Sequence, residues 1–480
     1  APQLRGGPAR RLRAHEASGG AQSRAAERAE EVREAIRHVW QGYKAKAWGH
    51  DEVLPISGEF RDNWGAVKLQ VLEVMDTLWL AGLREEFREA ESALATLNFT
   101  SDIEGVQTSF FEMTIRGLGG LLAAHALSGS PVALSRAQEL GSRLLEAFPK
   151  AGRNNWPAVS INVRHPEEAD FGAVTSLADV ASNGVEFTYL SQATGNRTFR
   201  DAAYAVMAKV ARRNSQMGAQ LAPKDLFQRA EDYPMHSYYV TVGAGADSYY
   251  EYLLKMYLQS RQREPKLLAA WQAAMREMRD GLIKKTEGGL TYIAEEGSRL
   301  ANGSLVSGLE TMGQLGCFMG GQLALAAHRL PAKDVEAWWL PTAEELVRGC
   351  YESFHRTDSG LAPESLEFYK AKVVAMNLQY IQRPETLESL FYVYRATGNE
   401  TYRDWSYNIF HAINTHLKTP WGFAQASDVT ELPVPLMDKQ ETFMAAEVLK
   451  YALLIQLPAS ALPLDKYVFT TEAHPVLIAS

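Results

Sequence analysis

Apolar residues recur at intervals of three and four along most of the chain, which is the period of an amphipathic helix. The segment 32–48 shows this pattern, with its large apolar side chains on one face: Val32, Ile36, Val39, Trp40 and Tyr43. Only short pieces read as extended, such as 288–296 and the tail from residue 465. The chain is therefore predicted to be all-α, with minor β-hairpins.

One pattern occurs twice. The run Tyr189–Asp201 returns as Tyr394–Asp404, and looser echoes lie at 80–94 and 121–141. Each reads as helix, glycine-containing turn and helix, which is an αα-hairpin. Several such hairpins in one chain predict a closed or curved array, in which each unit buries its apolar face on its neighbours. A ring of paired helices would enclose a central cavity.

The first 30 residues differ from the rest. They are rich in Ala, Arg, Gly and Glu and nearly free of large apolar side chains, so they bury little. We expect residues 1–30 to form a poorly ordered stem or tether and residues 31–480 to form a single domain. No signal peptide is visible at Ala1, which is expected of a processed form or a luminal fragment, so any membrane anchor would lie upstream.

Overall composition excludes several classes of protein. The net charge of −8 gives no basic footprint for nucleic acid, and no apolar run reaches the length of a membrane span. With 480 residues and 46% hydrophobic content, the chain can build a large core. A monomer that folds in water is expected.

The two cysteines, Cys317 and Cys350, are compatible with two buried thiols or with one disulfide, and their spacing does not choose between these. N-glycosylation sequons favour the disulfide, because they indicate the secretory pathway. The four sequons begin at Asn98, Asn196, Asn302 and Asn399. We therefore expect a protein of the endoplasmic reticulum or Golgi lumen, or a secreted one.

Three carboxylates lie in or beside apolar, aromatic-rich helical stretches: Glu112, Asp247 and Glu385. An isolated ionised carboxylate is costly to bury, so each needs an arginine, a metal, water or a polar ligand. Structural pairing with Arg116 or Arg383 is one interpretation. The other is a polar cavity in which two carboxylates flank a glycosidic bond, one as acid and one activating water.

Two further stretches carry candidate chemistry. Phe443 and Glu447 share a helical face in the segment 438–451, and an aromatic ring beside a carboxylate is suited to holding a sugar. Near the end of the chain, Thr471 and Glu472 offer oxygen ligands to a hard cation, although a capped turn explains the same residues.

These stretches match a known family. From about Val32 to Pro475 the chain resembles the class I α-1,2-mannosidases, glycoside hydrolase family 47. Nine blocks follow the family's order: AWGHDEVLPIS (47–57), VMDTLWLAGL (74–83), FFEMTIRGLGGLL (110–122), GVEFTYLSQATGN (184–196), GADSYYEYLLK (245–255), LGCFMGGQLALAA (315–327), RPETLESLFY (383–392), ETFMAAEVLKY (441–451) and YVFTTEAHP (467–475). So many ordered blocks make a chance match untenable.

The resemblance implies an (α/α)7 barrel with a C-terminal hairpin that plugs it. It also implies an inverting exo-hydrolase that removes terminal α-1,2-linked mannose from high-mannose N-glycans of glycoproteins, with one bound Ca²⁺. The family's disulfide falls on Cys317 and Cys350.

The resemblance also assigns roles. Glu112 would be the general acid, whose proton reaches the leaving oxygen through water, with Arg116 beside it. Asp247 and Glu385 would flank the attacking water, and Glu385 is favoured as the base. Thr471 would bind Ca²⁺ through its hydroxyl and its carbonyl. The remaining residues would line the sugar and metal site: Glu186, Arg383, Glu388, Phe443, Glu447 and Glu472.

The chain departs from the family pattern at three positions. Family members commonly carry His at the position of Gln314 and Asn at that of Thr470. Two residues before Asp247, enzymes of the endoplasmic reticulum type resemble one another in having Arg and those of the Golgi type in having Leu, whereas this chain has Gly245. A subsite contact at Gln314 and the preference for one glycan branch are therefore open.

Two other functions compete with this interpretation. A degradation-enhancing mannosidase-like protein would bind or slowly trim mannose glycans in quality control, but such relatives usually lack the cysteine block present here. Another α-toroid enzyme, such as a glucoamylase-like hydrolase or a terpene cyclase, has no use for the TEAHP segment and, for the cyclase, would need an absent DDxxD motif.

Overall fold

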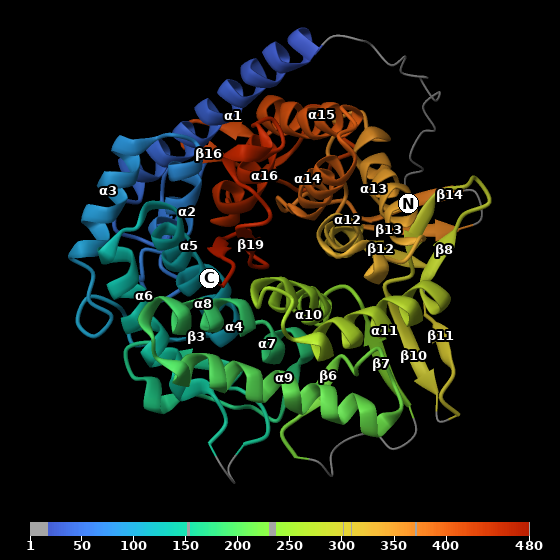
Figure 1. Ribbon diagram of the computed structural model, residues 1–480. Coiled ribbons are helices and arrows are strands. Elements are labelled where there is room, and N and C mark those ends of the chain that lie inside the picture. Colours follow the sequence, from blue (N-terminus) through green and yellow to red (C-terminus); the bar gives the residue numbers. More distant parts are fainter. Residues whose placement is uncertain are drawn as a thin grey trace.

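We describe the protein from a computed structural model, which covers residues 18–150, 154–229, 237–300, 302–308, 310–369 and 372–479. Within these residues, seven inner helices alternate along the chain with seven outer helices, and together they form a ring (Figure 1). The inner helices are α2 (Leu69–Leu80), α5 (Gly119–Ser128), α8 (Gly184–Thr194), α10 (Asp247–Gln259), α12 (Phe318–Arg329), α14 (Glu385–Thr397) and α16 (Leu449–Leu454). The outer helices are α1 (Ser18–Lys46), α3 (Arg84–Ala95), α6 (Pro131–Leu144), α9 (Arg197–Met217), α11 (Pro265–Gly281), α13 (Trp339–His355) and α15 (Thr401–His416).

Burial separates the two layers. Inner helix α10 is buried along nearly its whole length, whereas outer helix α11 buries one stripe that includes Leu268, Trp271 and Met275. Each inner helix contacts the next, and a π-helical turn at Met444–Val448, which leads into α16, packs on α2. The predicted (α/α)7 barrel is confirmed, and the first and last inner elements close it.

The repeated pattern forms the turns between paired helices, as predicted. Helix α8 ends at Gly195, whose φ of 73° is accessible to glycine at little cost, and the Asn196 side chain accepts the Thr198 amide to cap α9. The turn between α14 and α15 repeats this arrangement with Gly398 at φ 68°.

Part of the segment predicted to be a poorly ordered tether is helical. Helix α1 begins at Ser18 and not near residue 31, and Ala25 and Ala29 are buried within it. These small side chains pack closely without giving a strong hydrophobic signal, which is why the sequence pattern missed them. Residues 1–17 lie outside the described part of the chain.

The barrel loops contain many short strands. Their two to six residues give too few alternating positions for a sequence pattern to reveal most of them. The strands outside the C-terminal hairpin are β1 (Glu52–Val53), β2 (Phe60–Arg61), β3 (Gln107–Ser109), β4 (Ser160–Asn162), β5 (Val174–Ser176), β6 (Asp225–Phe227), β7 (Ser237–Thr241), β8 (Ile283–Lys285), β9 (Thr291–Ile293), β10 (Glu296–Leu300), β11 (Leu305–Ser307), β12 (Thr311–Gly313), β13 (Ser365–Tyr369), β14 (Lys372–Asn377), β15 (Lys418–Thr419), β16 (Gly422–Phe423), β17 (Gln425–Ala426) and β18 (Leu436–Met437). The predicted extended piece at 288–296 forms β9 and the start of β10.

The C-terminal hairpin enters the ring. Strands β19 (Tyr467–Phe469) and β20 (Pro475–Leu477) pair with Phe469 opposite Pro475, and they contact the inner helices α10, α5 and α8. Figure 1 shows β19 inside the ring of helices. The hairpin therefore plugs the barrel as predicted, and its turn, residues 470–474, lies among the inner helices.

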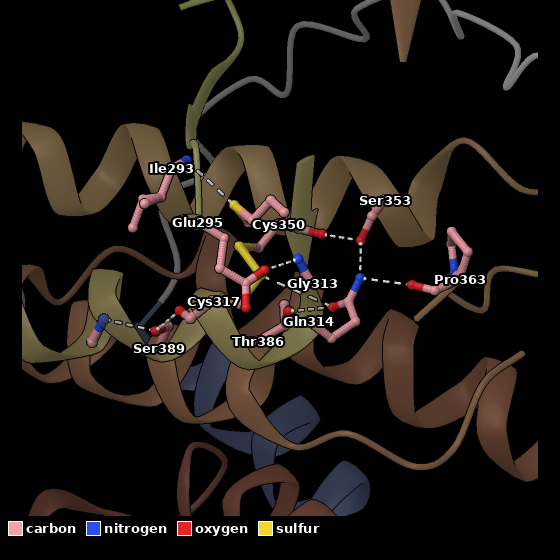
Figure 2. Close-up of a disulfide and its surroundings, with 12 residues drawn as sticks. Ile293, Glu295, Gly313, Gln314, Cys317, Cys350, Ser353, Pro363, Thr386 and Ser389 are labelled. Atoms are coloured by element: carbon pink, nitrogen blue, oxygen red, sulfur yellow. Dashed lines mark hydrogen bonds between the residues drawn. A yellow bond between two sulfur atoms is a disulfide. The ribbon is translucent and has the colours of Figure 1, made fainter. Parts of the chain in front are cut away.

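The disulfide between Cys317 and Cys350 is confirmed, and it joins the segment before α12 to α13 with 5.9 Å between the Cα atoms. Figure 2 shows Gln314 beside it. The buried amide of Gln314 donates to the Ser353 hydroxyl at 3.0 Å and to the Pro363 carbonyl at 3.1 Å. Gln314 thus contributes to packing near the disulfide and does not line the cavity described below.

Candidate active site

A cavity of about 270 Å³ opens where the turn of the C-terminal hairpin meets the ends of the inner helices. Nine of the candidate catalytic, sugar-binding and metal-binding residues line it, and they come from five separate segments of the chain. They are Glu112, Arg116, Asp247, Arg383, Glu385, Phe443, Glu447, Thr471 and Glu472. All three candidate catalytic carboxylates are therefore brought to one cavity.

Glu112 and Arg116 form one wall. The Ser109 hydroxyl accepts the Glu112 amide at 3.2 Å and caps a short helix, after which the backbone continues as a π-helical turn, Met113–Leu118. The Arg116 Nε donates to the Glu112 carboxylate at 2.6 Å. Its Nη1 lies 3.3 Å from Glu73 and 2.9 Å from Glu472, so one guanidinium contacts three carboxylates.

A second π-helical turn, Met444–Val448, carries Glu447 and directly follows Phe443. π-Helical turns are uncommon and concentrate at functional sites, because the extra residue re-aims the side chains that follow it. Phe443 is nearly buried, and the Arg116 guanidinium lies 5.1 Å from its ring centroid. An apolar ring surface is thus presented beside the carboxylates.

Asp247 and Glu385 begin the helices α10 and α14. The Asp247 carboxylate accepts the amide of Ser248 at 2.9 Å. The Glu385 Oε2 is buried without a hydrogen-bond partner among the described residues. The neighbouring Arg383 donates its Nε to Glu364 at 2.9 Å, and among the described residues it makes no hydrogen bond to Glu385. One oxygen of Glu385 is therefore free to accept a hydrogen bond from a ligand or water.

Burial raises the pKa of these carboxyls. It raises that of Asp247 to about 7, and the nearby charges of Glu251 and Glu385 contribute. It also raises the pKa of Glu385 to about 7, although Arg383 partly opposes the change. For Glu472, burial raises the pKa to about 8 against the opposing charge of Arg116. Burial thus favours the neutral form of these carboxyls, and a cation bound beside them would favour the charged form.

Thr471 lies on the cavity wall in the turn of the C-terminal hairpin. Its amide donates to the Tyr252 hydroxyl at 3.1 Å, and that hydroxyl donates to Glu186 at 2.5 Å. Among the described residues, neither the carbonyl nor the hydroxyl of Thr471 has a hydrogen-bond partner. Two oxygen atoms of this cavity-lining residue are therefore available as ligands.

Two predicted site residues do not line the cavity. Glu186 is wholly buried beneath the turn on Tyr252, and Glu388 lies 3.6 Å from the ammonium group of Lys255. Both support residues that contact the turn, so the structure places them one layer behind the cavity wall.

The sequence reasoning missed other charged residues near the site. Asp179 lines the cavity, and Glu73 contacts Arg116 from α2. Asp76, Lys255 and Lys450 are buried beneath the turn. The available signal was a charged side chain inside an almost wholly apolar helical run, as in VLEVMDTLWL (71–80).

Comparisons with known proteins agree with this geometry. Residues 35–478 match Glycosyl hydrolase family 47. The human endoplasmic reticulum mannosyl-oligosaccharide 1,2-alpha-mannosidase is 35% identical over 93% of this chain, which spans 63% of that relative. The Arabidopsis thaliana mannosyl-oligosaccharide 1,2-alpha-mannosidase MNS1 is 33% identical over 95% of this chain and 79% of its own length.

Among solved structures, the alpha-1,2-mannosidase from Trichoderma reesei superposes with a TM-score of 0.84 at 25% identity. The match covers 94% of this chain and 99% of that one, so the fold is shared along nearly the whole chain. Fold, cavity and sequence lead to the same conclusion: this chain belongs to glycosyl hydrolase family 47.

Proposed function

We propose that this protein is an exo-acting, inverting α-1,2-mannosidase that removes terminal mannose from high-mannose N-glycans. The observation that carries the proposal is the convergence of Glu112, Asp247 and Glu385 on one small cavity with Phe443 in its wall. A cavity of about 270 Å³ lies at the small end of ligand pockets and suits one sugar residue, not a length of glycan. The relatives and the solved structure are named as 1,2-alpha-mannosidases, which supports mannose as the sugar removed and α-1,2 as the linkage cleaved.

In this proposal Glu112 is the general acid, and its proton reaches the leaving oxygen through a water molecule. Arg116 fixes the orientation of that carboxyl. Glu385 removes a proton from the water that attacks the anomeric carbon, because its Oε2 is free. A base with a pKa near 7 is well matched to this task. Asp247 holds the same water, and its carboxylate is already partly engaged by Ser248.

The sugar ring would rest on Phe443, an arrangement in which an apolar ring face packs on an aromatic side chain. Arg383, Glu447 and Glu472 border the same space and can bond sugar hydroxyls. Inversion follows if one water attacks from the face opposite the leaving group in a single displacement.

The cavity also fits a calcium ion. Calcium takes six to eight oxygen ligands, and Thr471 offers a free carbonyl and a free hydroxyl among surrounding carboxylates. No group of three or more His, Cys, Asp or Glu in the described part of the chain could hold a metal ion, so water and sugar hydroxyls would complete the coordination. A bound calcium would supply positive charge against the buried carboxylates and oxygen coordination for the sugar.

We also propose a place in the lumen of the secretory pathway. All four predicted sequon asparagines are exposed, and the side chain of each accepts the amide two residues ahead. The disulfide needs the same oxidising environment. No helix in the described ranges combines the length and the apolar character needed to cross a membrane.

A single experiment tests the activity. The protein is incubated with a nine-mannose N-glycan, and products are followed by mass, while proton NMR reads the anomer first released. We expect successive loss of mannose as the β anomer. Glycan that is bound but never shortened would identify a lectin, and release of the α anomer would reject the inverting mechanism.

Calcium is tested separately. A ligand that binds only the folded state stabilises it, by about 4 kcal/mol at a thousandfold excess over Kd. Chelation is expected to lower both Tm and activity, and Thr471→Ala to remove the response of Tm to added calcium. An unchanged Tm on chelation would exclude the metal.

A further inference from the structure

Two fully buried lysines lie beneath the turn of the C-terminal hairpin. Lys255 is on α10 and Lys450 is on α16, and neither side chain has exposed surface. Burying an ammonium group costs several kcal/mol unless charge and hydrogen bonds compensate it. Neither lysine lines the cavity, so direct contact with a sugar does not explain them.

Each lysine has its own carboxylate partner. Lys255 pairs with Glu251, one helical turn earlier, and Lys450 lies 2.6 Å from Asp76 on α2. These pairs account for the charges. They do not account for the direction of the remaining N–H bonds, which go to the turn.

Both ammonium groups donate to main-chain carbonyls that flank Thr471. Lys255 donates to the carbonyl of Thr470 at 3.2 Å, and Lys450 donates to the carbonyl of Ala473 at 2.7 Å. The two lysines therefore hold the turn from two different inner helices, just before and two residues after the cavity-lining Thr471.

Two further side chains of the turn are also held by hydrogen bonds. The Thr470 hydroxyl accepts the amide of His474 at 3.1 Å, and the His474 ring contacts Asp76 at 3.1 Å. Ala473 adopts a φ of 57°, which is unfavourable for a residue with a Cβ and persists only when its surroundings enforce it. After these bonds, the free groups of Thr471 are its carbonyl and its hydroxyl.

We propose that Lys255 and Lys450 are positioning residues: by holding the carbonyls of Thr470 and Ala473 they direct the two oxygens of Thr471 into the cavity. This inference rests on the proposed calcium site and extends it to residues one layer behind it. Groups that orient metal ligands typically contribute 10- to 100-fold to metal affinity. The two lysines therefore set the affinity of the cavity for calcium without contacting the ion.

The experiment compares calcium affinity in variants that keep the local charge balanced. Lys450→Met is combined with Asp76→Asn, and Lys255→Met with Glu251→Gln, so that the nearest carboxylate of each lysine is neutralised together with it. Affinity is measured from the dependence of Tm on free calcium and by isothermal titration. We expect it to fall about 10- to 100-fold in each double variant. The single variants Asp76→Asn and Glu251→Gln show how much of the loss belongs to the carboxylates.

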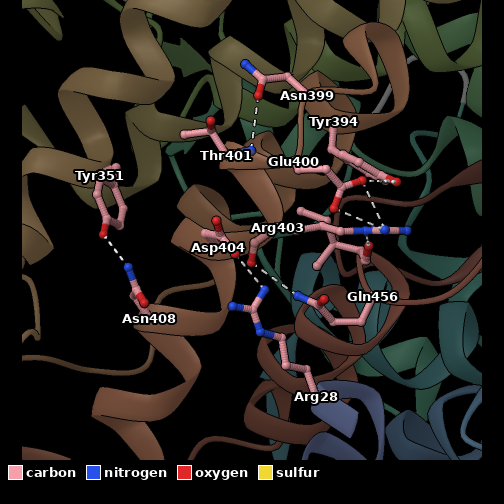
Figure 3. A network of polar contacts seen from close by, with 11 residues as sticks. Arg28, Tyr351, Tyr394, Asn399, Glu400, Thr401, Arg403, Asp404, Asn408 and Gln456 are labelled. Carbon is pink, nitrogen blue, oxygen red and sulfur yellow. Dashed lines mark hydrogen bonds and ion pairs between the residues drawn. The ribbon is translucent and has the colours of Figure 1, made fainter. Parts of the chain in front are cut away.

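Arg403 on α15 provides a matched control. It is also a buried cation that donates to a main-chain carbonyl, that of Ile455 at 2.8 Å, and it lies outside the cavity in the network of Figure 3. Arg403→Met is expected to lower Tm and to leave calcium affinity unchanged. An equal loss of affinity in this control would reduce the lysines to general stabilisers and overturn the proposal.

Hydrogen exchange of the Thr471 and Ala473 amides gives a second readout that does not need the metal. Exchange is expected to accelerate in the lysine variants and to stay unchanged in Arg403→Met.

If wild type binds no calcium, the proposed calcium site is wrong, but this measurement still decides whether the lysines hold the turn. If a Met variant does not fold, Lys255→Gln and Lys450→Gln replace it. The inference would be rejected if calcium affinity and amide exchange both stayed unchanged in the Met variants or in the Gln variants.

Discussion

Two arginines border the cavity, and they use their charge differently. Arg116 is nearly buried and bonds the candidate acid Glu112 directly, together with Glu73 and Glu472. Arg383 is 24% exposed and bonds Glu364, which does not line the cavity, and Glu385 keeps an oxygen without a partner among the described residues. One wall of the cavity therefore fixes a carboxyl in place, whereas the other leaves a carboxylate available to water.

Removing the acid should have the largest effect. Glu112→Gln keeps the shape of the side chain and its bond from Arg116 but cannot deliver a proton, so kcat should fall about 10²- to 10⁴-fold with sugar binding largely retained. Steady-state rates and binding of a mannose disaccharide check this. A rate near that of wild type would remove Glu112 from the acid role.

Removing the base is expected to lower kcat by a similar factor, because activation of water matters mainly in the transition state. Glu385→Gln tests this, and Glu364→Gln is its control, since Glu364 bonds Arg383 outside the cavity. A normal kcat with lost binding would reassign Glu385 as a sugar ligand. An equal loss of kcat in both variants would show that the ion pair of Glu364 with Arg383 matters as much as Glu385, and would contradict a specific role of Glu385 as the base.

Stability should separate the two arginines. Arg116→Met leaves the fully buried Glu73 without its cation, and breaking a buried pair typically costs about 3–5 kcal/mol. Arg383→Met breaks a partly exposed pair, for which about 1 kcal/mol or less is expected. Denaturant unfolding measures both. Equal losses would mean that the contrast in burial has no energetic consequence.

The raised pKa of Asp247 predicts a pH dependence of folding. Its folded pKa of about 7 exceeds the ordinary value of 3.8, so the unfolded chain binds fewer protons between these values and stability falls as pH rises through this window. With calcium removed by a chelator, the free energy of unfolding of wild type should fall by up to about 1.4 kcal/mol per pH unit between pH 4 and 7, relative to that of Asp247→Asn. Unfolding curves at several pH values measure this, and parallel profiles for the two proteins would contradict it.

The smallest effect concerns glycan branches. Gly245 lines the cavity, so Gly245→Arg would place the N–H donors of a guanidinium there. Because Gly245 has a φ of 88°, the substitution also strains the backbone, at a cost of about 1–3 kcal/mol. Wild type should trim several α-1,2-mannoses, and the variant should favour one branch by a few-fold. Time-resolved product profiles check both parts, with Gly245→Ala as the control for backbone strain. An unchanged product order in the arginine variant would place specificity in other loops.

The sequence predicted the helices because their apolar stripes are long, and it predicted the turns because Gly195 and Gly398 have few alternatives at positive φ. The family resemblance, and not periodicity, brought residues as distant as Glu112 and Thr471 into one site. The lysines escaped notice because Lys255 and Lys450 follow a helical spacing that is also typical of surface residues. Only the fold shows that both are buried against main-chain carbonyls, since no local pattern records which helices face each other.

The hairpin that plugs the barrel follows every barrel helix in the sequence. The turn that carries Thr471 and Glu472 is therefore synthesised after every helix of the barrel. Until residues 467–477 have been made, the chain lacks Thr471, and both lysines lack the carbonyls that they hold in the folded protein. The order of synthesis thus leaves the candidate active site incomplete until the C-terminal hairpin has been translated.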